Sequence, residues 1–241
     1  MKAALIGYGK MGHVIESVLL EKGHSVSFRI SEENKGEIHD IRPDNTDVCF
    51  EFTGPNSAFD NLTILIQQGL PVVCGTTGWY ARMPEIYDLV KKQGTSFVAA
   101  SNFSIGVNLF FEAARQLSAL MKHRGYSVEI NETHHIHKKD APSGTAITLS
   151  EQVRAVLEEF EGYQLNSENE DNLIPIFSHR LEDVPGTHEL RFGNEIDAIS
   201  LKHVAFNRNG FALGAVMTGE YIIGRKGIFT IGEILKHTMY S

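Results

Sequence analysis

The first twelve residues, MKAALIGYGKMG (residues 1–12), decide the class of fold. The apolar run Lys2–Ile6 predicts a buried strand, and the glycines at 7, 9 and 12 lead into a segment with helical periodicity. In a turn of this spacing the first glycine permits a tight bend, the second lets a pyrophosphate approach the backbone, and the third lets helix and strand pack closely. The helix N-terminus adds N–H groups and a positive dipole. We interpret this stretch as a dinucleotide-binding turn; a tight turn without a ligand is the alternative.

The same alternation of strand and helix continues to residue 100. Polar residues fill Ser31–Thr46 without periodicity, so we expect a loop there on the rim of the sheet. Alternating strands and helices imply a parallel sheet covered on both faces, with right-handed crossovers. The further strands predicted by apolar runs are Ser25–Ile30, Val48–Phe52, Pro71–Cys74 and Ser96–Ala100.

After residue 100 the pattern changes, because several strands follow one another without helices between them. Consecutive strands indicate an antiparallel or mixed sheet, and therefore a second domain. A polar patch at 166–172 predicts a surface loop. The expected elements are helices at Ile105–Met121, Thr145–Phe160 and 210–223, and strands at Ser127–Thr133, Ile174–Leu181, Thr187–Phe192 and Glu195–His203.

Composition excludes several classes of protein. The 241 residues carry a net charge of −8, which disfavours nucleic-acid and anionic-membrane partners. No apolar run reaches the ~18 residues of a membrane helix, and the N-terminus lacks the apolar core of a secretory signal. The two cysteines, Cys49 and Cys74, lie in apolar runs and are expected to be buried thiols of a reducing compartment. We therefore expect a cytoplasmic protein.

Two further strand ends favour a cofactor crevice. Phe52-Thr53 and Gly75-Thr76-Thr77 each follow an apolar strand at its carboxyl end, where ligands bind in open parallel sheets. No acidic residue ends the second strand, although Glu32 and Glu33 follow it, and Arg29 with Lys10 could instead meet a 2′-phosphate. The choice between NADH and NADPH stays open.

The most chemically loaded segment is ETHHIHKKDAPSGTA, residues 132–146. Its histidines and lysines could form a solvated basic loop or, less readily, a metal site, since adjacent histidines do not easily share one ion. The third interpretation is an anion pocket. There His and Lys supply charge and a proton, and Ser143-Gly144-Thr145 opens a helix whose N–H groups bind a carboxylate.

Taken together, GYGKMG, FTGP, GTTG, ASNFSIGVN and ETHHIHKKDAPSGTA resemble the dihydrodipicolinate (4-hydroxy-tetrahydrodipicolinate) reductases, and the resemblance extends to the closing KGIFTIGEIL. It implies an α/β protein with a Rossmann-type dinucleotide-binding domain, expected at 1–104 and 214–241. It also implies a smaller α+β substrate and oligomerisation domain with a mixed sheet, expected at 105–213, in a homotetramer. A C-terminal helix is expected to return to the first domain.

The resemblance also implies residue roles. His134 matches the proton donor/acceptor and Lys138 the general acid, while His135 and the Gly144-Thr145 pair match the contacts to the substrate carboxylate. No metal is expected. Including Arg29, the expected cofactor-binding residues are Gly7, Tyr8, Gly9, Lys10, Met11, Gly12, Arg29, Phe52, Thr53, Gly75, Thr76, Thr77, Ala100, Ser101, Asn102 and Phe103.

The activity implied is the NADH- or NADPH-dependent reduction of 4-hydroxy-tetrahydrodipicolinate, a cyclic dicarboxylate of diaminopimelate and lysine biosynthesis. Three alternatives come from other classes: a relative of the same plan acting on an amino acid or sugar, a nucleotide-sensing regulator, and a metal-dependent hydrolase. The clustered acid and anion cradle argue against the regulator. Stoichiometric metal in the purified protein would favour the hydrolase.

Overall fold

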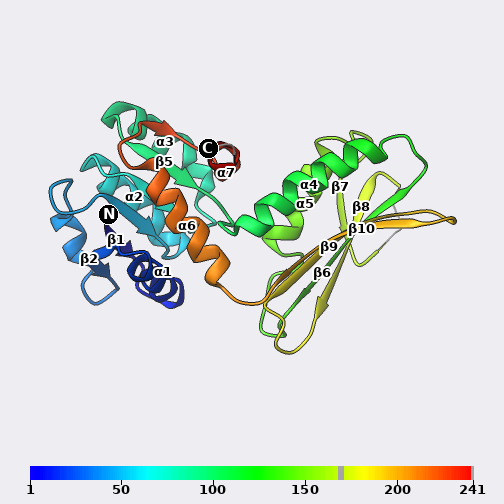
Figure 1. Cartoon of the computed structure of the whole chain (residues 1–241), viewed down its shortest axis with the longest axis horizontal. Helices are drawn as coiled ribbons and strands as arrows, with labels where there is room; N and C mark the ends of the chain where they lie inside the picture. The colour runs from blue at the N-terminus through cyan, green and yellow to red at the C-terminus, as the bar shows by residue number, and fades with distance from the viewer. Residues whose placement is uncertain (168–170, 240–241) are drawn as a thin grey trace. The chain divides into compact units, whose positions relative to one another are not determined.

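The computed structural model describes residues 1–167 and 171–239, which divide into two compact units. Unit 1 comprises residues 1–105 together with the chain from Arg208 onward, and unit 2 comprises Gly106–Asn207. Each unit has its own sheet, seen as separate groups of strands in Figure 1. The loop predicted at 166–172 includes residues 168–170, which lie outside the described residues.

Unit 1 is built on a parallel sheet in the order β11-β5-β4-β3-β1-β2. Consecutive strands are joined by crossovers, as the alternating pattern predicts, so the carboxyl ends of all strands meet at one edge. The strands are β1 (Lys2–Ile6), β2 (Ser25–Ile30), β3 (Val48–Glu51), β4 (Val72–Cys74), β5 (Ser96–Ala99) and β11 (Gly227–Ile228).

Helices cover both faces of this sheet. Alternate residues of β1 enter different apolar clusters, because successive side chains of a strand point to opposite faces. Ala3 and Leu5 pack with α1 (Lys10–Glu21) and α6 (Asn209–Ile222), while Ala4 and Ile6 pack with α2 (Pro55–Gln67) and α3 (Met83–Gln93). Unit 1 also contains the short 3₁₀ helix η2 (Tyr80–Arg82) and the C-terminal helix α7 (Ile231–Met239).

The polar stretch Ser31–Thr46 is more ordered than predicted. It contains the 3₁₀ helix η1 (Lys35–Asp40), and Ile38 and Ile41 are buried in the cluster that α2 and α3 form. Two isolated isoleucines among polar residues are too few to establish a period. The prediction of a plain loop on the rim was therefore wrong for this stretch.

Unit 2 is a mixed five-stranded sheet in the order β10-β9-β6-β8-β7. Strand β6 pairs parallel with β8 and antiparallel with β9, which confirms the mixed sheet predicted from consecutive strands. Its helices pack on one face, where Val128 and Ile130 meet Phe110 and Leu149. The elements are α4 (Ile105–Met121), β6 (Ser127–His134), α5 (Gly144–Arg154), β7 (Gly162–Leu165), β8 (Leu173–Arg180), β9 (Gly186–Gly193) and β10 (Ala198–Ala205).

Several boundaries differ from those predicted. The helix expected to reach Phe160 ends at Arg154. The prediction was too long because Leu157, in the turn that follows, is also buried, so the apolar pattern continues where the chain is no longer helical. Strand β10 begins at Ala198, not at Glu195. The short strands β7 and β11 were not predicted, since two to four residues show no reliable alternation.

Neither unit offers a membrane helix: none of the described helices is both long and apolar enough to cross a bilayer. Both cysteines are free and buried, as expected. Burial raises the pKa of the Cys49 and Cys74 thiols, so neither is a reactive thiolate.

Candidate active site

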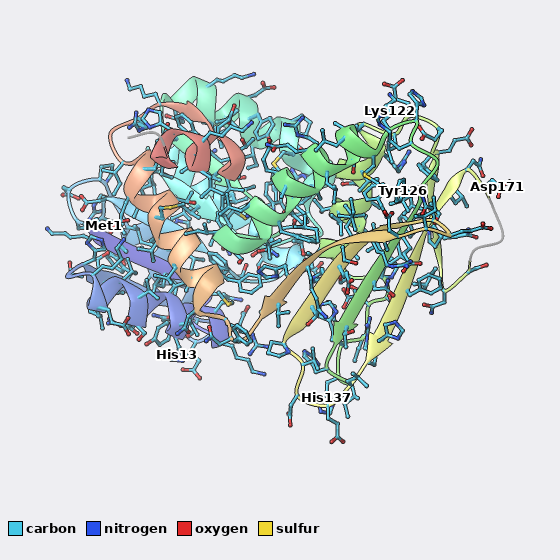
Figure 2. The ribbon with its side chains drawn as sticks, turned by 45° about the vertical axis from the view of Figure 1, so that its right-hand side comes forward. Met1, His13, Lys122, Tyr126, His137 and Asp171 are labelled. Atoms are coloured by element: carbon cyan, nitrogen blue, oxygen red, sulfur yellow. The ribbon has the colours of Figure 1, made fainter. Side chains whose placement is uncertain are left out.

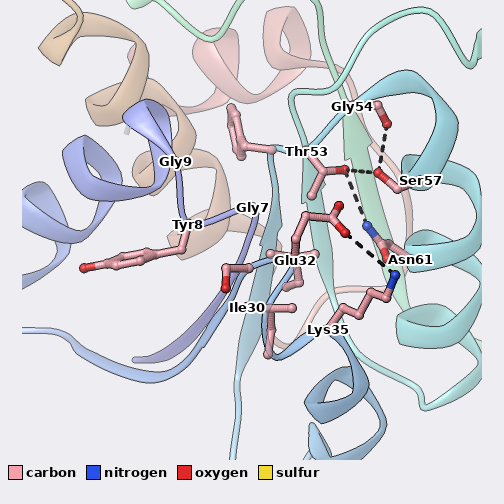
Figure 3. A pocket seen from close by; sticks show the side chains of 13 residues that line it. Gly7, Tyr8, Gly9, Ile30, Glu32, Lys35, Thr53, Gly54, Ser57 and Asn61 are labelled. Carbon is pink, nitrogen blue, oxygen red and sulfur yellow. Dashed lines mark hydrogen bonds and ion pairs between the residues drawn. The ribbon is translucent and has the colours of Figure 1, made fainter.

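A cavity of about 460 Å³ opens at the carboxyl edge of the unit 1 sheet (Figure 3). It lies where β1 and β3 end, between the turn after β1 and the start of α2. Its lining residues are Ile6, Gly7, Tyr8, Gly9, Ile30, Ser31, Glu32, Lys35, Phe52, Thr53, Gly54, Ser57 and Asn61. Of the expected cofactor-binding residues, Gly7, Tyr8, Gly9, Phe52 and Thr53 thus share one cavity.

The three glycines of the first turn differ in what surrounds them. Gly7 has a φ of +96° and a Cβ there would lie 2.1 Å from the carbonyl oxygen of Phe52, so only glycine fits. A Cβ on Gly12 would lie 2.7 Å from the carbonyl oxygen of Gly7, which brings α1 close to the turn. At Gly9, the N-cap of α1, no atom lies within 4 Å of an added Cβ, so the backbone is open to a ligand.

The ends of β3, β4 and β5 meet beside this turn. The backbone N–H of Thr53 donates to Thr76 Oγ1 at 2.8 Å, and the ring of Phe52 covers Gly75, whose added Cβ would lie 2.1 Å from that ring. The rings of Phe52 and Phe103 are 6.0 Å apart. The structure therefore brings the Gly75–Thr77 and Ala100–Phe103 segments to the same edge as Phe52, while Lys10 and Met11 begin α1.

Arg29 lies in an ion pair. Its Nε donates to Glu16 Oε1 at 2.8 Å, and Tyr8 also donates to the Glu16 carboxylate. The hydrogen bond from Arg29, more than any other contact, holds the pKa of Glu16 below its ordinary value. Glu32 and Lys35 line the cavity instead, with their charged atoms 3.7 Å apart, as the dashed line in Figure 3 marks.

A second cluster of polar side chains lies in unit 2, at the carboxyl end of β6. Alternation along β6 places Glu132 and His134 on the face that carries Val128 and Ile130, the buried face. Glu132 is fully buried and His134 is 7% exposed. Strand pairing sets His188 of β9 directly opposite Glu132, and parallel pairing sets Ser178 of β8 on its other side.

The Glu132 carboxylate is held from several sides. The backbone N–H of Ser143 lies 3.1 Å from each carboxylate oxygen, and Ser178 Oγ donates to Oε1 at 2.7 Å. Arg180 Nη2 lies 3.5 Å from Oε1. Burial alone would raise the pKa of Glu132, but the hydrogen bonds from Ser143 and Ser178 keep it below its ordinary value. A buried, ionised carboxylate results.

Two histidine rings face this carboxylate. His134 Nδ1 lies 3.5 Å and His188 Nε2 lies 3.7 Å from Glu132 Oε2, and the rings are 5.0 Å apart. Burial lowers the pKa of His134 despite the nearby Glu132, and it lowers the pKa of His188 to about 3. An added Cβ on Gly186 would lie 3.2 Å from His134 Nε2, so the glycine leaves room for that ring. Both imidazoles are neutral at pH 7.

The expected general acid lies on the loop that follows. Lys138 Nζ pairs with Asp140 Oδ2 at 2.8 Å. Arg180 fixes the same loop by donating to the carbonyl oxygens of Lys138 at 3.4 Å and Asp140 at 2.6 Å.

The remaining histidines of the segment lie beyond the end of β6. His135 and His137 line a hollow of about 220 Å³ with Ile136, Glu182 and Asp183. Figure 2 shows His137 at the opposite end of β6 from Tyr126.

The same loop ends at the start of α5. Ser143 is the N-cap residue, and its Oγ accepts from the backbone N–H of Ala146 at 3.2 Å. Ser143 Oγ also lies 3.2 Å from His188 Nε2. Gly144 and Thr145 form the first turn of α5, where the helix dipole favours an anion. His134 at the end of β6 and Gly144-Thr145 at the start of α5 therefore lie at the two ends of one loop, which carries Lys138.

Glu132, His134 and His188 also meet the geometry of a metal site, since one donor atom from each lies within 4.8 Å of the others. Two positively charged side chains near this cluster disfavour a bound metal ion. Arg180 already pairs with Glu132, and the charge of Lys138 acts on His134. The donor set therefore suits a proton better than a divalent ion.

Sequence reasoning missed four residues of this cluster: Glu132 as a carboxylate partner, Ser178, Arg180 and His188. The even spacing of Glu132 and His134 on one strand could have placed them on a common face. Nothing local links either residue to β8 or β9, because those contacts depend on strand pairing.

Comparison with known proteins gives concordant results for both units. Residues 1–103 match the family described as "Dihydrodipicolinate reductase, N-terminus", and residues 106–235 match "Dihydrodipicolinate reductase, C-terminus". The chain is 42% identical over 236 residues to a 4-hydroxy-tetrahydrodipicolinate reductase of Christiangramia forsetii, covering 98% of both chains. It is 33% identical to that of Thermosipho africanus, again with 98% of each covered. A solved dipicolinate-bound dihydrodipicolinate reductase from Paenisporosarcina sp. TG-14 has the same fold, with a TM-score of 0.76, 23% identity and coverage of 95% and 97%.

Proposed function

This chain belongs to the dihydrodipicolinate reductase family and is an oxidoreductase of diaminopimelate and lysine biosynthesis; from that premise we propose which residues carry its reaction. The substrate is 4-hydroxy-tetrahydrodipicolinate, reduced with a nicotinamide dinucleotide. The observation that carries the assignment is that one loop joins the His134–Glu132 pair at the end of β6 to the N-terminus of α5, in a chain whose other unit has an open dinucleotide turn.

The residues of unit 1 fit the dinucleotide. The open backbone at Gly9 and the start of α1 suit a pyrophosphate, and the 460 Å³ cavity beside them suits the ribose and base. Both NADH and NADPH are proposed to bind. Glu32 can accept from ribose hydroxyls, whereas Lys35 beside it can meet a 2′-phosphate. Arg29 is already paired with Glu16.

The residues of unit 2 fit a cyclic dicarboxylate. We assign one substrate carboxylate to the first turn of α5, at Gly144 and Thr145, and we assign His135 to the same carboxylate. The positive end of the helix dipole favours a carboxylate there, and the Ser143 cap stabilises the turn. Dipicolinate, the molecule bound to the solved reductase from Paenisporosarcina sp. TG-14, is a planar dicarboxylate of the same class.

His134 and Lys138 are proposed to handle the proton. When bound, the dihydronicotinamide supplies a hydride, so a negative charge develops on the substrate ring and must be met by a proton. Lys138 carries mobile protons at Nζ, and His134 presents an imidazole beside a buried carboxylate. A correctly placed acid contributes ~10²–10⁴ to the rate.

A coupled assay tests the function. The substrate is generated in place from aspartate semialdehyde and pyruvate by the preceding synthase, and the absorbance of NADH or NADPH is followed. We expect oxidation of both cofactors that depends on every component. Absence of oxidation with either cofactor, in protein that binds the dinucleotide, would overturn the assignment and favour a nucleotide-sensing regulator.

The open face of the unit 2 sheet supports a homotetramer. The described helices of unit 2 pack on one face only, so Glu129, Glu189, Lys202 and Val204 point to the other. Apolar side chains are exposed on and next to β10: Val204 is 42% exposed on this open face, and Phe206, just after the strand, is 85% exposed. The two free buried thiols agree with a cytoplasmic location.

A further inference from the structure

Among the described residues of unit 2, Glu132 is the most completely buried charged group, and the proposed reaction gives it no step of its own. Its carboxylate is 0% exposed, yet it is ionised. Burying such a charge is costly unless hydrogen bonds and a partner compensate for it. Ser143 and Ser178 supply the hydrogen bonds, and Arg180 supplies a positive partner to Oε1. The other oxygen, Oε2, faces the two histidines.

The ring of His134 is oriented toward this oxygen. Its Nδ1 is buried, makes no hydrogen bond to the described residues, and lies 3.5 Å from Glu132 Oε2. A ring nitrogen that faces a carboxylate carries the proton of the neutral imidazole, and the other nitrogen is then free for catalysis. That other nitrogen, Nε2, is the one for which Gly186 leaves room.

We propose that Glu132 is a positioning residue that holds the proton of neutral His134 on Nδ1, so that Nε2 is the atom that exchanges protons with the substrate. The inference rests on the proposed role of His134. Nε2 first takes up a proton from water; in the donating step that Nε2–H bond breaks, and a bond from the proton to the substrate ring forms. The electron pair stays on Nε2, and water restores the proton afterwards.

Other groups face His134 from each element packed against it, and their combined effect makes a stabilising carboxylate necessary for the protonated ring. Lys138 and Asp140 act on it from the loop and Arg180 from β8, and the ring of His188 lies beside it from β9. The two cations and burial disfavour the imidazolium, and His188 is neutral. Glu132 is therefore the nearest group that stabilises the protonated ring.

The replacement Glu132→Gln gives a specific test. Ser178 and Arg180 donate to the Oε1 position, so the amide oxygen of the glutamine takes that side and its NH₂ faces His134. An amide N–H donates to Nδ1 and moves the ring proton to Nε2. We expect ¹⁵N NMR of histidine-labelled protein to show His134 as the Nδ1–H tautomer in the wild type and as the Nε2–H tautomer in the variant. The His134→Gln spectrum assigns the signal.

Kinetics provide the second measurement. Glu132→Gln should lower kcat by ~10²–10⁴ with a smaller change in KM. In the His134→Gln background the same replacement should cost little more, because both act through one ring. Glu151→Gln on the exposed side of α5 removes a carboxylate of the same unit and should leave kcat unchanged.

Four outcomes would contradict the inference or the role on which it rests. An unchanged tautomer in Glu132→Gln, or an Nε2–H tautomer already present in the wild type, overturns the inference. A rise in KM that adds to the loss in His134→Gln also overturns it, because Glu132 would then only hold the loop at Ser143. Full activity of His134→Gln refutes the proposed role of His134 itself, whatever the tautomer. If Glu132→Gln does not fold, Ser178→Ala provides a milder variant. It keeps the charge of Glu132 but removes the hydrogen bond to its Oε1, and it should also lower kcat.

Discussion

Gly9 and Gly12 stand three residues apart and differ in what a side chain would meet. At Gly9 an added Cβ has no neighbour within 4 Å, and the φ of −102° suits other residues. Gly9→Val should therefore leave the fold intact but block the pyrophosphate, and abolish binding of NADH and NADPH in fluorescence titrations. Gly12→Val is the contrasting variant, since its Cβ would meet backbone at 2.7 Å and should lower the melting temperature. Unchanged dissociation constants for Gly9→Val would contradict the site.

Replacement of Lys138 and replacement of Thr145 should change different kinetic parameters. Lys138→Ala removes the proposed proton donor, which is needed only as charge develops, so kcat should fall by ~10²–10⁴ in the coupled assay. Thr145→Val removes the proposed contact to a carboxylate that is present before and during reduction, so its main effect should be on KM. Charged hydrogen bonds contribute ~1.5–3 kcal/mol, which predicts inhibition by pyridine-2,6-dicarboxylate weakened at least ~10-fold. Wild-type turnover by Lys138→Ala would mean that the proton comes from elsewhere.

Among the elements, α5 depends on its first residue. Ser143 caps the helix through Oγ while its backbone N–H binds Glu132, so the cap and the buried carboxylate are joined. Ser143→Ala keeps the backbone contact and loses the cap, which should lower the free energy of unfolding in urea by about 0.5–2 kcal/mol. Thr148→Ala in the middle of the same helix is the control and should not destabilise it. Equal stabilities of the two variants would contradict the capping role.

At the same scale the sequence predicted the unit 1 elements well and the cluster in unit 2 poorly. Helical periodicity and the glycines of the first turn are local features, so α1, α2 and α3 appear where they were expected. Ile38 and Leu157 show where prediction from periodicity fails. Both are buried by packing outside a regular α-helix or strand, so no local pattern reveals their burial. His188 joins Glu132 only through the antiparallel pairing of β9 with β6, and no local pattern contains that pairing.

For the whole molecule, acid should weaken the fold over a definite range. The pKa of His188 lies near 3 when folded, against 6.5 for a free histidine, so between these values the unfolded chain binds more protons. The contribution of neutral His188 to the free energy of unfolding is therefore complete above pH 6.5. It is lost as the pH falls below that value, by up to ~1.4 kcal/mol per pH unit. Urea unfolding at several pH values should show a smaller slope for His188→Asn than for the wild type. Identical slopes would contradict a buried neutral His188.

Assembly is the other property of the whole molecule. An exposed sheet face with apolar residues at β10 needs a partner, and closed symmetry with four copies is expected. Light scattering should give four times the chain mass of 26.8 kDa at micromolar concentration. Phe206→Asp should shift the mass toward smaller species while the far-ultraviolet circular dichroism stays the same. A wild-type mass of one chain would contradict the tetramer.

The chain leaves unit 1 after Ile105 and returns at Arg208, and this has a consequence for biosynthesis. While the ribosome is still translating unit 2, the nascent unit 1 lacks α6, whose Ala215 and Val216 close the cluster around Phe50, and β11, which pairs with β5. The inserted unit 2 is continuous and can be completed first. A message truncated before codon 208 would therefore yield an uncovered sheet with an unpaired edge, a substrate for chaperones and proteases.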